Sequence, residues 1–206
     1  MNQMKTILAL AAGNQQRARE IIREMGLHEA WQAVGARTEE VGSLRSGLLC
    51  KHLDIDLHVY SPTPLRVERS FAAAARIAAH PRIRRMEYAN LLDAEDRCLE
   101  WHAQYEDHDG RLWQIDMIHM AEGSPWAGYF ERVADRIAAT LTEETREAIL
   151  RLKYETPNEE HIPGIALYRA VIEGGVRSRA ELKAWLQANP VEGIVTWMPE
   201  PNRTEP

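Results

Sequence analysis

Two acidic residues, Asp54 and Asp56, lie two positions apart in a segment where apolar and polar residues alternate. This alternation predicts a strand over residues 55–60. Side chains two positions apart on a strand project from the same face, so both carboxylates could bind one divalent cation or a close pair of cations. Two adjacent carboxylates repel each other unless a positive charge lies between them. The pair therefore predicts a metal site, although it could also form the solvent-facing side of an edge strand.

Gly42 and Ser43 precede this acidic pair, at a point where a strand turns into a short helix. A glycine in such a turn lets the backbone approach a phosphate closely. The backbone N–H groups and the serine hydroxyl can then donate hydrogen bonds to the phosphate oxygens. An anion-binding turn beside two carboxylates suits a magnesium-bound triphosphate.

The order Gly-Ser, then Asp-hydrophobic-Asp on a strand, resembles the signature of the nucleotidyltransferase superfamily related to DNA polymerase beta. The run Lys51-His52-Leu53-Asp54-Ile55-Asp56-Leu57 is also similar to the corresponding run in aminoglycoside and lincosamide nucleotidyltransferases. The resemblance covers residues 30–120 and departs from the family pattern at Leu44-Arg45-Ser46-Gly47, where many relatives carry Ala-Arg-Gly. A phosphate-binding role is therefore not expected of Arg45.

The resemblance implies a third carboxylate on a later strand of the same sheet. Asp116 is the only acid within the apolar body of the strand predicted over residues 111–120. Asp54 and Asp56 would then hold Mg²⁺ in a two-ion site, with one ion shared with Asp116. The phosphate-binding residues that the resemblance implies are Gly42, Ser43 and Lys51.

The activity that the resemblance implies is transfer of a nucleoside monophosphate from an NTP, such as ATP, to a hydroxyl of a small-molecule acceptor, with release of pyrophosphate. Asp116 could act through the shared metal or as the general base. An alternative is a catalytically silent member of the fold that binds a nucleotide or a protein partner. A third reading is an unrelated α/β domain in which the Gly-Ser and Asp-Ile-Asp motifs occur by chance.

Other polar residues could border such a site. His58 shares strand parity with Asp56, and His119 closely follows the third carboxylate, but hydrogen-bonded histidines without a functional role are common. Arg151, Lys153 and Tyr154 could reach phosphates across a cleft. A solvated helix end is the simpler explanation for these three residues.

The residues before 122 are expected to form both helices and strands, and those after 122 are expected to form helices. A helix over residues 65–79 is expected to bury one stripe, and Asp107-His108-Asp109-Gly110 predicts a hairpin turn. The predicted strands are 55–60, 82–88, 98–106 and 111–120, and the predicted helices are 14–25, 28–34, 65–79, 126–139, 143–154, 164–173 and 179–188. The stripe expected to be buried consists of Val67, Phe71, Ala74, Ala75 and Ala78.

These elements predict an α+β fold: a nucleotidyltransferase-like mixed β-sheet flanked by helices and followed by a C-terminal helical region. Residues 1–122 would form the α/β domain with its N-terminal helices, residues 123–190 the helical region, and residues 191–206 a tail. A chain of 206 residues is long enough to bury an adequate core.

The amino-acid composition narrows the classes of partner that the protein is expected to bind. Lysine and arginine number 25 against 31 acids, a net charge of −6, so no long nucleic acid is expected as a partner. The acidic stretch 88–109 would suit a cationic acceptor such as an aminoglycoside. Cys50 and Cys98 fit neither a disulfide framework nor the paired ligands of structural zinc, and no apolar run is long enough to cross a membrane. We therefore expect a cytoplasmic protein, with oligomers possible.

Overall fold

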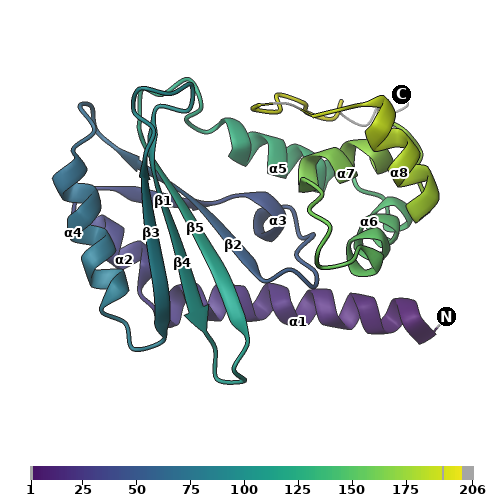
Figure 1. Ribbon diagram of the computed structural model, residues 1–206, viewed down its shortest axis with the longest axis horizontal. Helices are drawn as coiled ribbons and strands as arrows, with labels where there is room; N and C mark the ends of the chain where they lie inside the picture. The colour runs from purple at the N-terminus through teal and green to yellow at the C-terminus, as the bar shows by residue number, and fades with distance from the viewer. Residues whose placement is uncertain (1, 192, 201–206) are drawn as a thin grey trace.

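The computed structural model describes residues 2–191 and 193–200 and contains one five-stranded sheet in the order β1-β2-β5-β4-β3 (Figure 1). The central pair β2–β5 is parallel, whereas β1–β2, β4–β5 and β3–β4 are antiparallel. The strands are β1 (Arg37–Glu40), β2 (Asp54–Ser61), β3 (Ile83–Asn90), β4 (Cys98–Glu106) and β5 (Leu112–Ala121).

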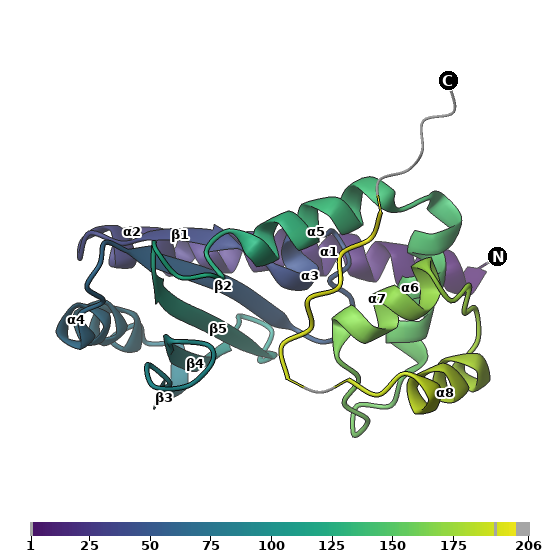
Figure 2. The same ribbon diagram turned by 90° about the horizontal axis from the view of Figure 1, so that it is seen from above.

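Helices flank this sheet and then form a region of their own beside it. Helices α1, α2 and α4 lie against one side of the sheet, and α6, α7 and α8 gather at one end of the molecule (Figure 2). The mixed sheet with flanking helices confirms the predicted α+β class. The helices are α1 (Asn2–Glu24), α2 (Leu27–Gln32), α3 (Gly42–Arg45), α4 (Val67–Ala78), α5 (Tyr129–Thr140), α6 (Glu143–Glu155), α7 (Gly164–Ile172) and α8 (Arg179–Ala188).

The main core lies between the sheet and helices α1, α2 and α4. Alternate residues of the central strands point into it, including Ile55 and Leu57 of β2 and Ile115 and Met117 of β5, all fully buried. The indole of Trp31 in α2 packs over this layer and donates a hydrogen bond to the Met117 sulfur at 3.4 Å. Because strand side chains alternate, the residues between these core positions project from the opposite face of the sheet.

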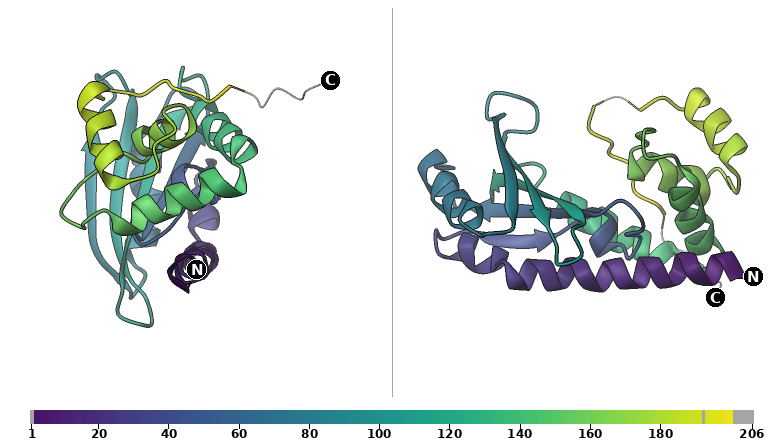
Figure 3. Two further views of the ribbon diagram at one scale, coloured as in Figure 1. Left: turned by 90° about the vertical axis from the view of Figure 1, so that its right-hand side faces the viewer. Right: turned by 60° about the horizontal axis from the view of Figure 1, so that its bottom comes forward.

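Helix α1 joins the two halves of the molecule. Its C-terminal part buries Ile21 and Ile22 in the main core, and its N-terminal part buries Ile7 and Ala11 in a second core formed with α5–α8. A helix of 23 residues spans about 35 Å, which is enough to underlie both halves (Figure 3). The sequence predicted only residues 14–25 of this helix, because the small and polar residues 11–14 interrupt its apolar periodicity.

The predicted buried stripe of α4 is wrong except at Ala74. The helix buries Ser70, Ala73, Ala74 and Ile77, whereas the Phe71 side chain is 45% exposed and its ring packs against Tyr88 and Trp101 at the sheet edge. Ser70 faces inward because its hydroxyl accepts a hydrogen bond from the Trp101 indole at 2.8 Å and contacts Nδ1 of His119 at 3.0 Å. A serine that satisfies buried ring nitrogens therefore takes the place that an apolar residue was expected to fill.

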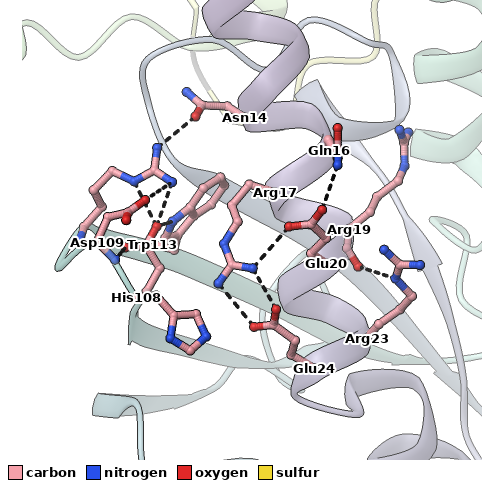
Figure 4. A network of polar contacts seen from close by, with 12 residues as sticks. Asn14, Gln16, Arg17, Arg19, Glu20, Arg23, Glu24, His108, Asp109 and Trp113 are labelled. Atoms are coloured by element: carbon pink, nitrogen blue, oxygen red, sulfur yellow. Dashed lines mark hydrogen bonds and ion pairs between the residues drawn. The ribbon is translucent and has the colours of Figure 1, made fainter.

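The predicted hairpin turn between β4 and β5 is confirmed and is bonded to α1 (Figure 4). The Asp107 carboxylate is nearly fully buried and accepts hydrogen bonds from the backbone N–H groups of Asp109 and Arg111 at 2.9 Å, and from the Trp113 indole at 3.0 Å. Arg111 in turn donates to Asn14 of α1 at 3.3 Å. These contacts fix the turn to the helix that underlies both halves.

Residues 193–200 of the predicted tail lie against the helical region. Trp197 and Met198 pack on its core, and the Tyr129 hydroxyl donates to the Thr196 carbonyl at 2.6 Å. Residues 192 and 201–206 of that tail lie outside the described residues. The proposed domain boundaries at 122 and 190 stay predictions. Among the described residues, no helix is long and apolar enough to cross a membrane.

Asp107 gives a first prediction about stability. We expect Asp107→Ala to lower the free energy of unfolding by about 2–3 kcal/mol, because several buried donors lose their acceptor. Burial raises the pKa of this carboxyl, but the hydrogen bonds from Trp113, Arg111 and Asp109 outweigh burial and hold the pKa below its ordinary value. The stabilisation is therefore present above the ordinary pKa of about 4 and is lost as the pH falls through the lower, folded-state pKa.

Urea unfolding of both proteins across this pH range measures the effect. Asp109→Ala is the matched control, because its side chain is 77% exposed and its removal should cost less than about 0.5 kcal/mol. Equal losses for the two variants at pH 7 would contradict the role of Asp107.

Candidate functional site

The three predicted carboxylates lie on one face of the central strand pair. In the β2–β5 register, Asp56 is directly opposite Asp116, and Asp54 is opposite Gln114. Neighbouring strands are about 4.8 Å apart, so paired side chains on the same face are close neighbours. The face that carries them is the one opposite the main core. The structure thus brings Asp54, Asp56 and Asp116 together as the sequence predicted; that they bind metal stays a prediction.

The side-chain carboxylates of Asp54 and Asp56 form no hydrogen bond or ion pair with any other described residue. Burial, followed by the charges of Asp116 and Asp54, raises the pKa of Asp56 to about 7. Burial also raises the pKa of Asp54, with the Asp116 charge adding to the effect and His52 opposing it. Lys153 acts in the opposite direction on both carboxyls without restoring their ordinary values. No lysine or arginine among the described residues therefore pairs directly with Asp54 or Asp56.

Asp116 is oriented by two donors from neighbouring strand positions. Nδ1 of His102 and Nε2 of Gln114 both lie 2.7 Å from its Oδ1 atom. Burial opposes protonation of His102, but its hydrogen bond to Asp116 and the charges of Asp116 and Glu100 raise the pKa of His102 overall. His102 lies directly opposite Asp116 on β4. The sequence analysis missed it, although the predicted hairpin turn fixes this pairing and could have revealed it.

Gly42 lies against Asp56 at the start of α3. Its backbone has φ = 59°, and a Cβ atom at this position would lie 2.3 Å from Oδ2 of Asp56. The preceding N–H of Val41 donates to the Asp56 carbonyl at 3.0 Å. The structure therefore requires glycine here for two reasons, the left-handed conformation and the close approach to the carboxylate.

Ser43 belongs to a polar cluster contributed by the helical region. Lys153 of α6 is 9% exposed, and its ammonium donates to the Ser43 hydroxyl at 2.9 Å, the Leu48 carbonyl at 2.9 Å and the Tyr168 hydroxyl at 3.1 Å. The Ser43 and Tyr168 hydroxyls are 3.0 Å apart. Lys153 is thus a buried cation fixed beside the predicted phosphate-binding turn, and the explanation of a solvated helix end does not apply to it.

The other cations near the motif are engaged elsewhere. The Lys51 ammonium donates to the Thr156 carbonyl at the end of α6, and Arg45 forms an ion pair with Asp135 of α5 at 2.7 Å. Arg151 donates to the Arg177 carbonyl at 2.9 Å, and Tyr154 is exposed. The role of Lys51 in phosphate binding stays a prediction, and a nucleotide would have to draw its ammonium away from Thr156.

Two cavities meet at the carboxylates. One, of 510 Å³, is lined mostly by polar and charged residues, including His52, Asp54, Gln114, Lys153 and His161. The second, of 540 Å³, is mainly apolar and extends beneath α5 and residues 193–195 of the C-terminal segment. Both cavities are lined by Ser43, Asp56, Asp116, Pro163 and Gly164. Two ligands could therefore approach the same carboxylates from different sides.

The two histidines that the sequence singled out lie on opposite faces of the sheet. His58 is buried on the face of the carboxylates and lines the apolar cavity. His119 is fully buried in the main core, where its Nε2 atom is 2.7 Å from the Ser61 hydroxyl. Burial lowers the pKa of His119 to about 4. His119 is therefore a hydrogen-bonded core residue.

The sequence matches no protein-family model and no curated protein. The fold, in contrast, is similar to solved structures. A structure of the Cid1 poly(U) polymerase with MgGTP bound has a TM-score of 0.59 at 14% identity, covering 83% of this chain and 55% of its own. The non-canonical poly(A) polymerase complex GLD-2–GLD-3 gives 0.58 at 13% identity, covering 91% and 59%. A Cid1 structure described for RNA terminal uridylyl transferase activity gives 0.55 at 17% identity, covering 82% and 54%.

These neighbours show that the fold is the nucleotidyltransferase fold, and that the chain spans little more than half the length of the proteins it resembles. The closer similarity to aminoglycoside and lincosamide enzymes is not confirmed. The expectation of a small-molecule acceptor and no long nucleic acid is contradicted, because the neighbours are polymerases of poly(U) and poly(A) and a terminal uridylyl transferase of RNA.

The net charge was a poor guide because it does not show how charges are distributed, and some acids of the stretch 88–109 form local ion pairs. Glu106 pairs with Arg84 at 2.7 Å, and Asp107 pairs with Arg111 at 2.9 Å. These acids therefore do not form a free anionic lining that would select a cationic acceptor. The total charge of a chain does not describe the charge of its binding surface.

Asp56 generates a prediction about stability and metal. Without divalent cations at pH 8, Asp56→Asn should raise the Tm by about 2 °C or more, because it removes a desolvated charge beside two others. The raised pKa means that the folded carboxyl costs stability increasingly as the pH rises from about 4 to about 7. The Tm values of the wild type and of Asp56→Asn should become equal at acid pH, where the Asp56 carboxyl is protonated. Mg²⁺ should raise the Tm of the wild type but not of the variant.

Thermal unfolding with and without MgCl₂ measures both effects. Asp93→Asn, in an exposed loop, is the matched control and should respond to Mg²⁺ as the wild type does. A variant less stable than the wild type at pH 8, with an unchanged response to Mg²⁺, would contradict the proposed charge repulsion.

A comparison of alanine substitutions at two glycines tests the importance of the close contact between Gly42 and Asp56. Gly42 and Gly47 both have positive φ, but a Cβ atom at Gly47 would meet nothing within 4 Å. Both alanine variants should lose about 1 kcal/mol of stability to backbone strain. Only Gly42→Ala should also displace the Asp56 carboxylate and abolish the Mg²⁺-dependent rise in Tm. Equal Mg²⁺ responses in the two variants would show that the contact is unimportant.

Proposed function

We propose that this protein is a Mg²⁺-dependent nucleotidyltransferase that transfers a nucleoside monophosphate from an NTP to a hydroxyl group. The observation that carries the proposal is the in-register placement of Asp56 and Asp116, with Asp54 beside them and no protein cation paired with Asp54 or Asp56 among the described residues. The nucleotidyltransferase fold of the neighbours supports the same activity.

The donor set fits magnesium. It consists of carboxylate oxygens, the ligands that Mg²⁺ prefers, and within the part of the chain that the structure describes no thiol or imidazole is hydrogen-bonded to Asp54 or Asp56. The pKa of Asp56, raised to about 7, indicates that this carboxylate lacks a stabilising positive charge. A bound magnesium ion would supply this charge, neutralise phosphate oxygens and lower the pKa of an attacking hydroxyl.

The chain's own residues would position the reactants. Asp54 and Asp56 would hold the metal–nucleotide complex, and Asp116, fixed by His102 and Gln114, would accept the proton of the attacking hydroxyl or share a metal with it. The Gly42 turn and the Ser43 hydroxyl would bind phosphate oxygens. Lys153, held against Ser43, would place its charge beside them without a reorientation at the moment of reaction.

The two cavities support a reaction of two substrates. Transfer to a hydroxyl requires the attacking hydroxyl oxygen and the leaving pyrophosphate oxygen to lie on opposite sides of the α-phosphorus of the nucleotide. The polar and apolar cavities both open onto Asp56 and Asp116, so each substrate could occupy one of them. We take an RNA 3′ hydroxyl as the acceptor, because this is the acceptor class that the names of the structural neighbours indicate.

Extension of a 5′-labelled RNA oligonucleotide with each NTP in MgCl₂ tests this function. We expect the wild type to lengthen the RNA and release pyrophosphate, and Asp116→Asn to reduce the rate about 100-fold or more, since metal and proton-transfer effects each contribute several kcal/mol. Asp93→Asn should retain the wild-type rate.

Mg²⁺-dependent binding of a non-hydrolysable NTP separates the possible failures. Binding without extension of RNA would favour the alternative of a catalytically silent nucleotide-binding protein and would reject the RNA acceptor. If neither binding nor extension occurs, the nucleotidyltransferase proposal itself fails.

A further inference from the structure

A smaller cavity of 180 Å³ lies beside the carboxylate row, on the same side of the sheet. Its walls are largely apolar and include Met120, Trp126 and Phe130. Four residues with metal-binding side chains nevertheless line it: His58, Asp96, Cys98 and Glu100. Three come from the start of β4 and the loop before it, and His58 comes from β2. Cys98 and His58 are buried, whereas Asp96 and Glu100 are partly exposed.

The β4 residues form a compact cluster. Asp96, Cys98 and Glu100 alternate along the chain, and one possible ligand atom from each lies within 4.8 Å of the others. Zinc bonds are about 2.0–2.3 Å long, so small side-chain rotations would bring all three atoms onto one ion. Within the described residues, no lysine or arginine pairs with Asp96 or Glu100, and the buried Cys98 thiol has no hydrogen bond. The basic side chain in contact with the cluster is His102, whose Nε2 atom lies 3.4 Å from Glu100.

His58 supplies a second, independent observation. Its side chain is nine-tenths buried, and its Nδ1 atom lies 3.3 Å from the Tyr60 hydroxyl oxygen. The Tyr60 hydroxyl donates its own proton to Glu131, so its oxygen must accept from Nδ1–H of His58. In a neutral ring, Nε2 then carries a lone pair. That atom has no partner among the described residues.

This bonding pattern is the one that prepares a histidine to bind metal. Histidine ligands commonly donate their other ring nitrogen to a fixed acceptor, which sets the tautomer and aims the lone pair at the ion. Tyr60 is fully buried and is itself fixed by Glu131 and by the Gly128 N–H at 3.1 Å. Behind His58, Oε2 of Glu131 lies 3.9 Å from Nδ1 and is buried without a hydrogen-bond partner, so both acceptors on that side favour a proton on Nδ1. The His58 side chain lines the cavity, and its Nε2 atom forms no hydrogen bond with a described residue.

We propose that His58, Asp96, Cys98 and Glu100 form a Zn²⁺-binding site next to the carboxylate row. The combination of imidazole, thiolate and carboxylate favours zinc over magnesium. Binding would release the Cys98 proton to solvent and join β2 to the β3–β4 loop. Glu100 also contacts His102, which holds Asp116, so the ion would brace the strand that orients the third carboxylate. The site does not depend on the proposed transferase activity.

Cobalt titration of the full chain, freed of metal with a chelator, tests the site. Co²⁺ bound by a thiolate gives a sulfur-to-cobalt charge-transfer band in the near ultraviolet, which a carboxylate site cannot give. We expect the band to saturate at one Co²⁺ per chain and to disappear when Zn²⁺ is added. Cys98→Ser should lose the band. The matched control is Cys50→Ser, a buried free cysteine in the second core, which should keep it.

Further variants keep the test decisive if Cys98→Ser does not fold. His58→Gln and Asp96→Asn should each weaken Co²⁺ binding at least about tenfold while retaining a weaker band. Asp56→Asn should leave the band unchanged, which separates this site from the magnesium site. Absence of a band in the wild type, or equal bands in wild type and Cys98→Ser, would overturn the proposal.

Discussion

The parallel pairing of β2 with β5 is the constraint on which the site depends. Ile55 and Leu57 of one strand and Ile115 and Met117 of the other are fully buried in the main core. A slip of one residue in either strand would turn these side chains out of the core and aspartates into it. The register is therefore fixed by apolar burial on one face, and the like-charged carboxylates are brought together on the other. The burial of these apolar side chains offsets the electrostatic repulsion among the carboxylates.

Much of this arrangement could be predicted because it depends on local patterns. Alternation located β2 and β5, and it placed Asp54 and Asp56 on one face of β2 and Asp116 opposite the apolar residues of β5. The Asp107 turn placed β4 beside β5. The pairing of β2 with β5 could not be derived from alternation, because it joins segments that are far apart in the sequence. The family resemblance supplied that step by implying a third carboxylate in the same sheet.

The residues that the sequence analysis missed or undervalued make their important contacts with residues of other helices and strands. Lys153 looks like one of several cations at a helix end, and only the packing of α6 against residue 43 and α7 buries it. Asp96, Cys98 and Glu100 are separated by single residues, but their significance depends on His58 of β2, with which they share a cavity. The burial of Ser70 in α4 likewise depends on other elements, because its hydrogen-bond partners lie on β4 and β5. Periodicity within one element cannot show such partners.

The helical region supplies a cation but cannot complete the charge balance of the carboxylate row. Lys153 uses its three N–H bonds on Ser43, Leu48 and Tyr168, which hold the ammonium beside the turn and away from a direct ion pair with Asp56. Lys51 and Arg45 are bonded to α6 and α5, where they link the sheet to the helices. Lys153, Lys51 and Arg45 thus form contacts between the sheet side of the molecule and the helical region. Under the proposed function, the positive charge missing at Asp54 and Asp56 would come from a metal that arrives with the nucleotide, whose phosphates Lys153 and Ser43 would bind.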